Sequence, residues 1–443
     1  MKNSHAIKII KITAAVCITS VIITGCSYLD ETIEGLGEVL NGDDFSSEPK
    51  IGVAAEEDDA NTIDVYSENG ELLDEEYSVI ESAEIEDNAA RLPESNLAQI
   101  SVNAFDGGSS VYCYNKLSLT GQRTYREIYT ILDEALSDII LTTKDTEEID
   151  LAFRAVMVDH PEIFYCSGYS IGKYMVDGEL VKVSFGGTYT LDKDEIDEKK
   201  ELLEEYVKQV LISAPSSGDY EKIKYVYEYL VKNLNYDFGA ENNQNVLSVV
   251  ETGRTVCQGY AKMMQLLLSR MDIFCTLVNG RAKSGDSQSY NPHVWNIVRC
   301  NGLYYNVDPT WGDSAFNLID ETGDTVPSME INYEFLLVPD DFLKDSHKQE
   351  PVVEMPSCYS LTDNYYVREG FYFEEVDAKR LEEIFQREYA KGSTMLFIKA
   401  SDKNAYEELT GFLFDEHNVF SYTGQDNVRY VNVESRNLIM ISL

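Results

Sequence analysis

Three residues of the chain, Cys257, His293 and Asp308, have the types and the order that thiol-based acyl chemistry requires. A cysteine thiolate is a nucleophile, a histidine exchanges protons near neutral pH, and a carboxylate can orient the imidazole. In this arrangement Cys257 attacks an acyl carbon, and His293 takes the thiol proton and later protonates the leaving group. Asp308 fixes the tautomer and the orientation of the imidazole. The predicted chemistry is therefore acyl transfer through a cysteine thiol.

The residues that follow Cys257 predict a helix with this cysteine in its first turn. Apolar side chains recur along one face of that helix, at Ala261, Met264, Leu267, Leu268 and Met271. At a helix N-terminus, unpaired backbone N–H groups and the helix dipole stabilise a thiolate. By composition alone, a buried structural cysteine fits this position equally well.

Two apolar runs joined by Asn301-Gly302 predict a β-hairpin that holds His293 and Asp308. With a two-residue turn, these two side chains become diagonal neighbours on one sheet face, with Cβ atoms ~7 Å apart. A three-residue turn would place them on opposite faces. Taken singly, His293 could instead be a half-buried structural histidine, and Asp308 a cap at the end of its strand.

The motifs around these residues resemble the core of the transglutaminase-like superfamily. The motifs are Cys257-Gln258-Gly259-Tyr260-Ala261, His293-Val294-Trp295-Asn296 and Tyr305-Asn306-Val307-Asp308-Pro309-Thr310-Trp311. The resemblance covers about residues 220–347 and implies an α+β fold. In that fold a papain-like transglutaminase core packs the nucleophile helix on an antiparallel sheet, between flanking α+β regions. The triad of the family falls on Cys257, His293 and Asp308.

The resemblance leaves the reaction partner open, because the superfamily contains cross-linking acyl transferases, peptidases, amidases and inactive members. It also implies an oxyanion held by the backbone N–H of the nucleophile and by a second donor upstream. Tyr236, Gln244 and Asn245 are candidates for that donor, and their spacing does not choose among them. His160, in a separate motif, is expected to cap the helix before it.

The N-terminus predicts an export signal. An uncharged apolar run over residues 12–25 follows Lys2, Lys8 and Lys11. As a helix this run is too short to span ~30 Å of hydrocarbon comfortably. Its end, Ile23-Thr24-Gly25-Cys26, resembles a bacterial lipobox, so we expect a lipid on Cys26 that anchors the chain to the extracytoplasmic face of the cell membrane. The alternatives are an ordinary secretory signal and an uncleaved anchor.

The next segment is strongly acidic, with 22 Asp and Glu against one Lys and one Arg over residues 27–95. Such a composition predicts an extended, disordered tether, with a small acidic subdomain as the alternative. The domain organisation we predict is a lipoprotein signal peptide over residues 1–25, an acidic disordered tether over 26–95, an N-terminal α+β region over 96–218, the transglutaminase-like catalytic core over 219–350 and a small C-terminal α+β domain over 351–443.

Composition excludes several classes of protein. The chain of 443 residues has 78 Asp and Glu against 36 Lys and Arg, and this net charge of −42 disfavours binding to nucleic acid. It has no HExxH, paired CxxC or EF-hand pattern, so we expect no metal and no cofactor. Six cysteines remain after Cys17 and Cys26, and a free Cys257 would leave at least one other unpaired. Cys275 and Cys300 are candidate bridge partners.

We therefore predict a lipid-anchored, extracytoplasmic thiol enzyme that acts on peptide or amide bonds of a peptide or protein, including cell-wall peptides. Proteolysis or cell-wall processing is expected ahead of cross-linking. One alternative is an inactive core that serves as a cell-surface binding module. Another is a purely structural envelope lipoprotein, for which Cys257 would be unreactive.

Overall fold

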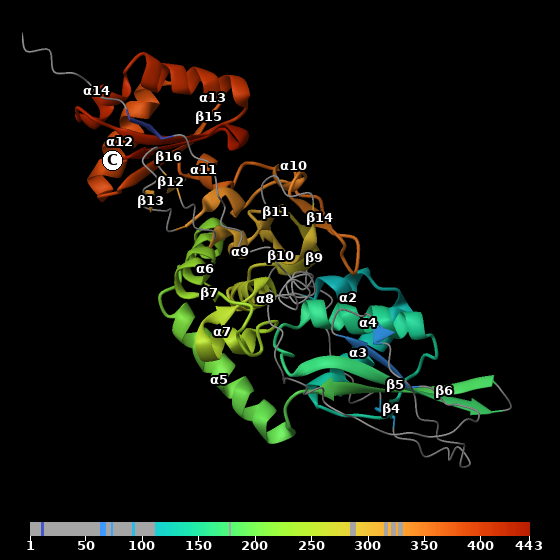
Figure 1. Cartoon of the computed structure of the whole chain (residues 1–443). Helices are drawn as coiled ribbons and strands as arrows, with labels where there is room; N and C mark the ends of the chain where they lie inside the picture. Colours follow the sequence, from blue (N-terminus) through green and yellow to red (C-terminus); the bar gives the residue numbers. More distant parts are fainter. Residues whose placement is uncertain are drawn as a thin grey trace, which may run out of the picture.

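The structure is a computed structural model that describes residues 10–12, 63–67, 72–73, 91–93, 111–176, 179–283, 289–313, 318–319, 325–326 and 331–443. Three lobes follow one another along the molecule (Figure 1). An N-terminal α+β lobe carries β5 and β6, a central lobe carries α8 and β9 to β11, and a C-terminal lobe carries α12 to α14 with its own sheet. The chain therefore mixes helices with largely antiparallel sheets, as predicted.

The N-terminal lobe packs three helices on one side of a five-stranded sheet of order β3-β2-β5-β6-β4. Its elements are β2 (Ile63–Ser67), β3 (Leu72–Leu73), α2 (Tyr112–Lys116), α3 (Leu119–Asp133), β4 (Ile139–Ile140), α4 (Thr146–Asp159), β5 (Cys166–Val176) and β6 (Glu179–Tyr189). The hairpin β5–β6 is the one that an Asp-Gly turn predicts. Buried Asp159 joins α2 to α4 because it accepts hydrogen bonds from the backbone N–H groups of Cys113 and Tyr114 and from the Tyr125 hydroxyl.

The first long helix of this lobe is shorter than predicted, and part of the predicted tether pairs with its sheet. The apolar spacing predicts a helix over residues 119–141, but α3 ends at Asp133, since Ala135 and Asp138 have φ of 53° and 55°. Left-handed backbone ends a helix. Of the predicted tether the structure describes β2, β3 and residues 91–93, and β2 pairs with β5. These strands belong to the N-terminal sheet, and the character of the rest of the segment stays a prediction.

The central lobe packs helices against a four-stranded antiparallel sheet of order β11-β10-β9-β14. Its elements are α5 (Lys193–Leu211), α6 (Asp219–Asn233), β7 (Asn235–Tyr236), α7 (Val246–Thr252), β8 (Arg254–Thr255), α8 (Cys257–Ser269), β9 (Cys275–Ala282), β10 (Asn291–Cys300), β11 (Leu303–Val307), α9 (Pro309–Gly312), β12 (Leu318–Ile319), β13 (Thr325–Val326), η3 (Tyr333–Phe335), α10 (Asp340–Leu343) and β14 (His347–Gln349). Helix α8 packs on β9 and β10, and its apolar face lies in the main core.

The C-terminal lobe is a separate α+β unit around a five-stranded sheet of order β1-β17-β18-β16-β15. Its elements are β1 (Ile10–Ile12), α11 (Tyr365–Arg368), β15 (Tyr372–Phe373), α12 (Ala378–Lys391), β16 (Met395–Ala400), α13 (Lys403–Thr410), η4 (Gly411–Asp415), α14 (Val419–Thr423), β17 (Arg429–Val433), η5 (Glu434–Arg436) and β18 (Leu438–Ser442). Strand β1 comes from the predicted signal peptide and pairs in parallel with β17. Residues 13–26, with the predicted lipidation site Cys26, lie outside the described residues.

The lobes contact one another through buried polar groups as well as apolar side chains. Gln265 of α8 donates a hydrogen bond to the backbone carbonyl of Val158 at the end of α4. Glu334 of η3 is buried and pairs with Lys399 and Arg436 of the C-terminal lobe. The central lobe is thus fixed on both sides, which keeps its helix and sheet in one arrangement.

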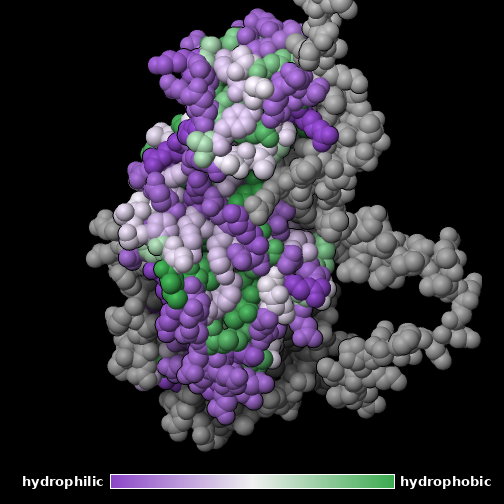
Figure 2. Space-filling view, turned by 90° about the vertical axis from the view of Figure 1, so that its left-hand side faces the viewer, coloured by the Kyte–Doolittle hydropathy of each residue, from purple (hydrophilic) through white to green (hydrophobic). Residues whose placement is uncertain are grey.

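The described part of the face that Figure 2 shows is mainly polar. Figure 2, which faces the side of the molecule where α5 to α7 lie, shows hydrophilic side chains over most of the surface and hydrophobic ones in small patches between them. Among the helices that the structure describes, none combines the length and the apolar character needed to span a bilayer.

Candidate active site

Cys257 is the first residue of α8, in the position that its sequence predicts. The extended backbone of Val256 precedes it, and the parallel pair β7–β8 aligns the segment. The first turn of α8 lies so close to Thr255 that a Cβ on Gly259 would come within 1.9 Å of Oγ1 of Thr255. That Thr255 hydroxyl donates to the Asn243 carbonyl. Glycine in the motif after Cys257 thus lets the first helical turn approach the preceding strand.

A buried amide connects α8, the helix that begins at Cys257, to the strand that carries His293. Asn296 of β10 donates from Nδ2 to the Ala261 carbonyl of α8 over 3.0 Å. Its position three residues after His293 and the position of Ala261 four residues after Cys257 fix the two chemical groups on a common frame. The fourth residue of the motif that begins with His293, Asn296, therefore has a structural explanation in this contact.

The hairpin register is the predicted one, and it brings His293 and Asp308 together. Cys300 pairs with Leu303 across the two-residue turn. Nε2 of His293 lies 2.6 Å from Oδ2 of Asp308. Asp308 also caps α9, because its Oδ1 accepts from the backbone N–H of Trp311 over 3.1 Å. The carboxylate therefore orients the imidazole with one oxygen and ends the strand as a cap with the other.

Cys257 contacts the same imidazole, so the three predicted residues form one chain of interactions. Cys257 is one of the groups that raise the pKa of His293, through a side-chain hydrogen bond and a charge interaction. Since Nε2 is taken by Asp308, Nδ1 is the nitrogen left for sulfur. Cys257 is half-buried, while the other five described cysteines are buried. Cys257 is thus the most exposed residue of the three.

The electrostatics favour a charged imidazole. Burial alone would lower the pKa of His293, but the charge and hydrogen bond of Asp308 and the contact with Cys257 outweigh it and raise this pKa to about 10. In turn, burial opposes ionisation of Asp308, yet the hydrogen bonds and charge of His293 and His347 hold its pKa below the usual range. An imidazolium beside a thiol favours the thiolate.

His347 also contacts Asp308, and the sequence analysis did not find it as a site residue. Its Nε2 lies 3.1 Å from Oδ2 of Asp308, and its side chain is 1% exposed. The chain has only five histidines, but no local pattern marks this one. Strand β14 places it, because His347 pairs with Ala282 of the sheet's third strand.

The same three side chains form a group whose ligand atoms could hold a metal ion, since those of His293, Asp308 and His347 lie within 4.8 Å of one another. Both imidazoles, however, point a nitrogen at one carboxylate oxygen, at hydrogen-bond distances of 2.6 and 3.1 Å. Metal ligands would converge on a common empty point instead. We therefore interpret the group as a hydrogen-bond network.

The segment that contains these three residues matches a known protein family. Residues 206–309 match the model of the transglutaminase-like superfamily, a segment that contains Cys257, His293 and Asp308. The chain contains a transglutaminase-like domain. The predicted fold class is confirmed, since this domain is a papain-like α+β fold in which α8, the helix that begins at Cys257, packs on an antiparallel sheet.

The domain is also similar to curated proteins. Human kyphoscoliosis peptidase is 25% identical over 185 residues, and the mouse protein is 26% identical over 185 residues. Each match covers 38% of this chain and 27% of the relative, so the chain spans about a quarter of the length of these relatives. Among solved structures, a crystal structure of a TGase matches 32% of this chain and 44% of its own chain, with 14% identity and a TM-score of 0.23.

The three candidates for the second oxyanion donor of the transglutaminase-like domain have different surroundings. Asn245 caps α7, because its side chain accepts from the Leu247 N–H. Tyr236 stacks on Tyr260 of the nucleophile helix, with ring centroids 6.4 Å apart. Gln244 is exposed, and its backbone carbonyl accepts from Lys262 of α8. Gln244 is thus the candidate whose side chain extends to solvent.

Two other expectations for the transglutaminase-like domain and its neighbour concern groups outside the triad. His160 is the C-cap residue of α4, as predicted, and its Nδ1 lies 2.7 Å from Glu162. All six described cysteines are free thiols. The candidate bridge between Cys275 and Cys300 is therefore not formed.

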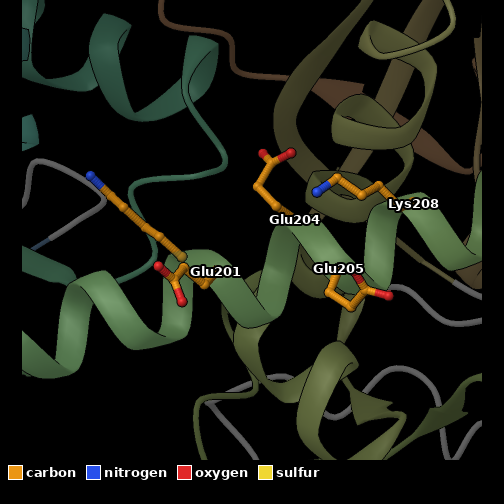
Figure 3. Close-up of a pocket in the computed structure, with 5 residues that line it drawn as sticks. Glu201, Glu204, Glu205 and Lys208 are labelled. Atoms are coloured by element: carbon orange, nitrogen blue, oxygen red, sulfur yellow. The ribbon is translucent and has the colours of Figure 1, made fainter.

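A hollow on the outer side of α5 lies apart from this site. Its lining residues are Lys200, Glu201, Glu204, Glu205 and Lys208, and Figure 3 shows the labelled side chains projecting from one helix. Lys200 pairs with Asp133, and Glu204 with Arg270. The two ion pairs link α5 to its neighbours, and the remaining charged side chains face solvent.

Proposed function

We propose that this chain is a thiol enzyme that acts on peptide or amide bonds through Cys257, His293 and Asp308. The observation that supports this most directly is the uninterrupted contact from the half-buried thiol through His293 to the buried carboxylate. The name of the curated relatives, a peptidase, supports hydrolysis ahead of transfer to an amine. The substrate proposed is a peptide or protein, including cell-wall peptide.

The proposed reaction uses the groups in a fixed order. The Cys257 thiolate adds to the carbonyl carbon, and the carbon–nitrogen bond breaks as His293 gives its proton to the leaving nitrogen. Water then adds to the thioester, His293 takes its proton, and the acid leaves as the thiol is restored. An amine in place of water would give a new amide. Asp308 stays ionised and keeps Nδ1 of His293 turned toward sulfur.

We further propose that the lipid-modified Cys26 holds the enzyme at the extracytoplasmic face of a bacterial membrane. The sequence of residues 23–26 supports this, together with the acidic segment that follows. Membrane fractionation of cells that express the full chain or Cys26→Ala tests the anchor. We expect the variant to leave the membrane fraction, and retention of the variant would contradict lipidation at this residue.

The test of the triad is the iodoacetamide alkylation rate of each cysteine in the folded protein between pH ~5 and ~9, followed by peptide mass spectrometry. Exposure alone would make Cys257 the fastest, since the other five described cysteines are buried. The diagnostic result is therefore the pH profile. We expect Cys257 to keep a high rate below pH ~7 and His293→Ala to shift the profile toward an ordinary thiol with a pKa near ~8.5.

Peptide and amine substrates complete the test. Release of amine from a peptide library and incorporation of a labelled primary amine would separate hydrolysis from transfer, with Cys257→Ser as the control. If Cys257 is slow at all pH values or indifferent to His293, the enzymatic proposal fails. A surface binding module would then take its place.

A further inference from the structure

Two histidines share one oxygen of the Asp308 carboxylate. Nε2 of His293 and Nε2 of His347 lie 2.6 and 3.1 Å from Oδ2, while Oδ1 accepts from the Trp311 N–H. An sp² carboxylate oxygen has two lone pairs in its plane, so the two imidazoles can occupy both. All contacts of the carboxylate are thus directional, and rotation of Asp308 would break three of them at once.

The second nitrogen of His347 defines its tautomer. Nδ1 lies 2.8 Å from the Ser346 hydroxyl oxygen, which is a donor or an acceptor as needed. Burial lowers the pKa of His347, and the charge on nearby His293 acts in the same direction against the hydrogen bond and charge of Asp308. A neutral His347 that pairs with ionised Asp308 must carry its proton on Nε2, which leaves Nδ1 to accept from the Ser346 hydroxyl. That hydroxyl then gives up its longer contact of 3.3 Å with the Leu343 carbonyl.

Aromatic rings hold the His347 imidazole in this orientation. The centroid of the imidazole lies 5.1 Å from the ring centroid of Trp295 in β10. The corresponding distances to Trp311 of α9 and Phe335 of η3 are 4.7 and 6.2 Å. The titratable groups that the structure places against the ring are His293 and Asp308. The ring therefore meets three aromatic side chains and the His293 imidazole around it, and it makes its hydrogen bonds through its two nitrogens.

We propose that His347 is a positioning residue, which donates Nε2–H to Asp308 and holds that carboxylate with Oδ2 turned toward His293. Its significance for catalysis rests on the proposed function. The chain of contacts then runs from β14, at the edge of the sheet, to α8, which packs on β9 and β10, and it orients the nucleophile. Its members are Ser346, His347, Asp308, His293 and Cys257. His347 itself does not reach the reacting atoms.

Two variants of the full chain separate positioning from packing. His347→Phe keeps a ring among the aromatic neighbours but removes the donor. His347→Gln places an amide N–H near the original Nε2. We expect His347→Phe to lower the alkylation rate of Cys257 below pH ~7 by about tenfold, as for loss of one hydrogen bond to a charged group, and to move the profile toward an ordinary thiol. We expect His347→Gln to restore most of the rate.

A packing role alone would give another result. It would lower the thermal midpoint of the variants and leave the pH profile of Cys257 as in the unmodified protein, and that outcome overturns the proposal. Histidine-selective ¹⁵N spectra of the unmodified protein give a test that needs no variant. We expect His347 to be the neutral Nε2–H tautomer at pH 7, and an Nδ1–H tautomer or an imidazolium would overturn the proposal.

These measurements also distinguish failure of the inference from failure of the proposed function. If the unmodified protein shows no reactive Cys257 below pH ~7, the enzymatic proposal fails. The ¹⁵N spectra still decide whether His347 donates to Asp308. If instead Cys257 is reactive and His347→Phe leaves its profile unchanged, only the role of His347 is wrong.

Discussion

His293 and Asp308 form a buried pair in which Nε2 of the imidazole lies 2.6 Å from Oδ2 of the carboxylate, with side chains 7% and 1% exposed. The pair joins the start of β10 to the residue after β11, so it depends on the register of one hairpin. The same contact leaves Nδ1 for Cys257. Local chain geometry and the proposed chemistry are therefore linked, and both can be tested.

The charged state of this pair predicts a pH-dependent stability. Asp308→Asn removes the carboxylate, and breaking a buried ion pair costs about 3 to 5 kcal/mol. The folded-state pKa of His293 is raised to about 10, so its stabilisation is complete below the unfolded pKa of ~6.5 and is lost as pH rises through about 10. The pKa of Asp308 is lowered, so its contribution is present above ~3.8 and lost as pH falls below that.

Urea unfolding of the unmodified protein and Asp308→Asn should therefore differ most between pH ~4 and ~6.5, and the difference should shrink toward pH ~10. The exposed pair Lys193–Asp197 provides the control, because Asp197→Asn should change stability by less than about 1 kcal/mol at any pH. A difference that stays constant from pH 5 to 10 would show that His293 is not charged in the folded protein.

Gly302→Ala tests the turn that sets the register. Gly302 has a φ of 87°, and no atom lies within 4 Å of the place that a Cβ would take. The cost is therefore purely conformational, about 1 to 2 kcal/mol by chemical denaturation. Gly411→Ala is the matched control, since Gly411 has a φ of −57° and a Cβ there would only touch Asp415 at 3.9 Å. Equal effects of the two changes would contradict this explanation.

Glu334→Gln should weaken the attachment of the C-terminal lobe. Burial opposes its ionisation, but the charges and hydrogen bonds of Lys399 and Arg436 lower its pKa to about 2. Removing the carboxylate takes the buried counter-charge away from Lys399 and Arg436, which costs about 3 kcal/mol or more. Hydrogen exchange should show faster opening of η3 and β16. The double variant Glu334→Gln/Lys399→Met should recover part of the stability, and no recovery would argue against the ion pair as the cause.

Asp313→Asn should stabilise the protein at neutral pH. Burial raises the pKa of Asp313 to about 6, against the hydrogen bond from Tyr260 that lowers it. Because this folded-state pKa lies above the unfolded one, the ionised group costs stability as pH rises from ~3.8 through about 6. The variant keeps a carbonyl acceptor for Tyr260, so we expect a gain of up to about 2 kcal/mol at pH 7 and none at pH 4. A loss at pH 7 would show that the charge is needed.

Several features follow from sequence because their causes are local. The apolar spacing after Cys257 predicts α8, and the Asn-Gly turn predicts the hairpin register, which together place the nucleophile and the His293–Asp308 pair. The same kind of pattern failed over residues 119–141, where apolar residues continue past the helix end. Left-handed backbone at Ala135 and Asp138 turns the chain into β4, and apolar spacing does not register that change.

Tertiary structure alone decided the rest of the site. The spacing of His347 from Asp308 does not indicate contact, since the pairing of β14 with β9 brings them together. Likewise, Lys399 and Arg436 reach Glu334 only because the C-terminal lobe packs on η3. Helix faces and tight turns depend on neighbours in the chain, whereas strand pairing and lobe packing depend on which distant surfaces bury each other. Sequence by itself therefore located Cys257, His293 and Asp308, and only the fold added His347 beside the Asp308 carboxylate.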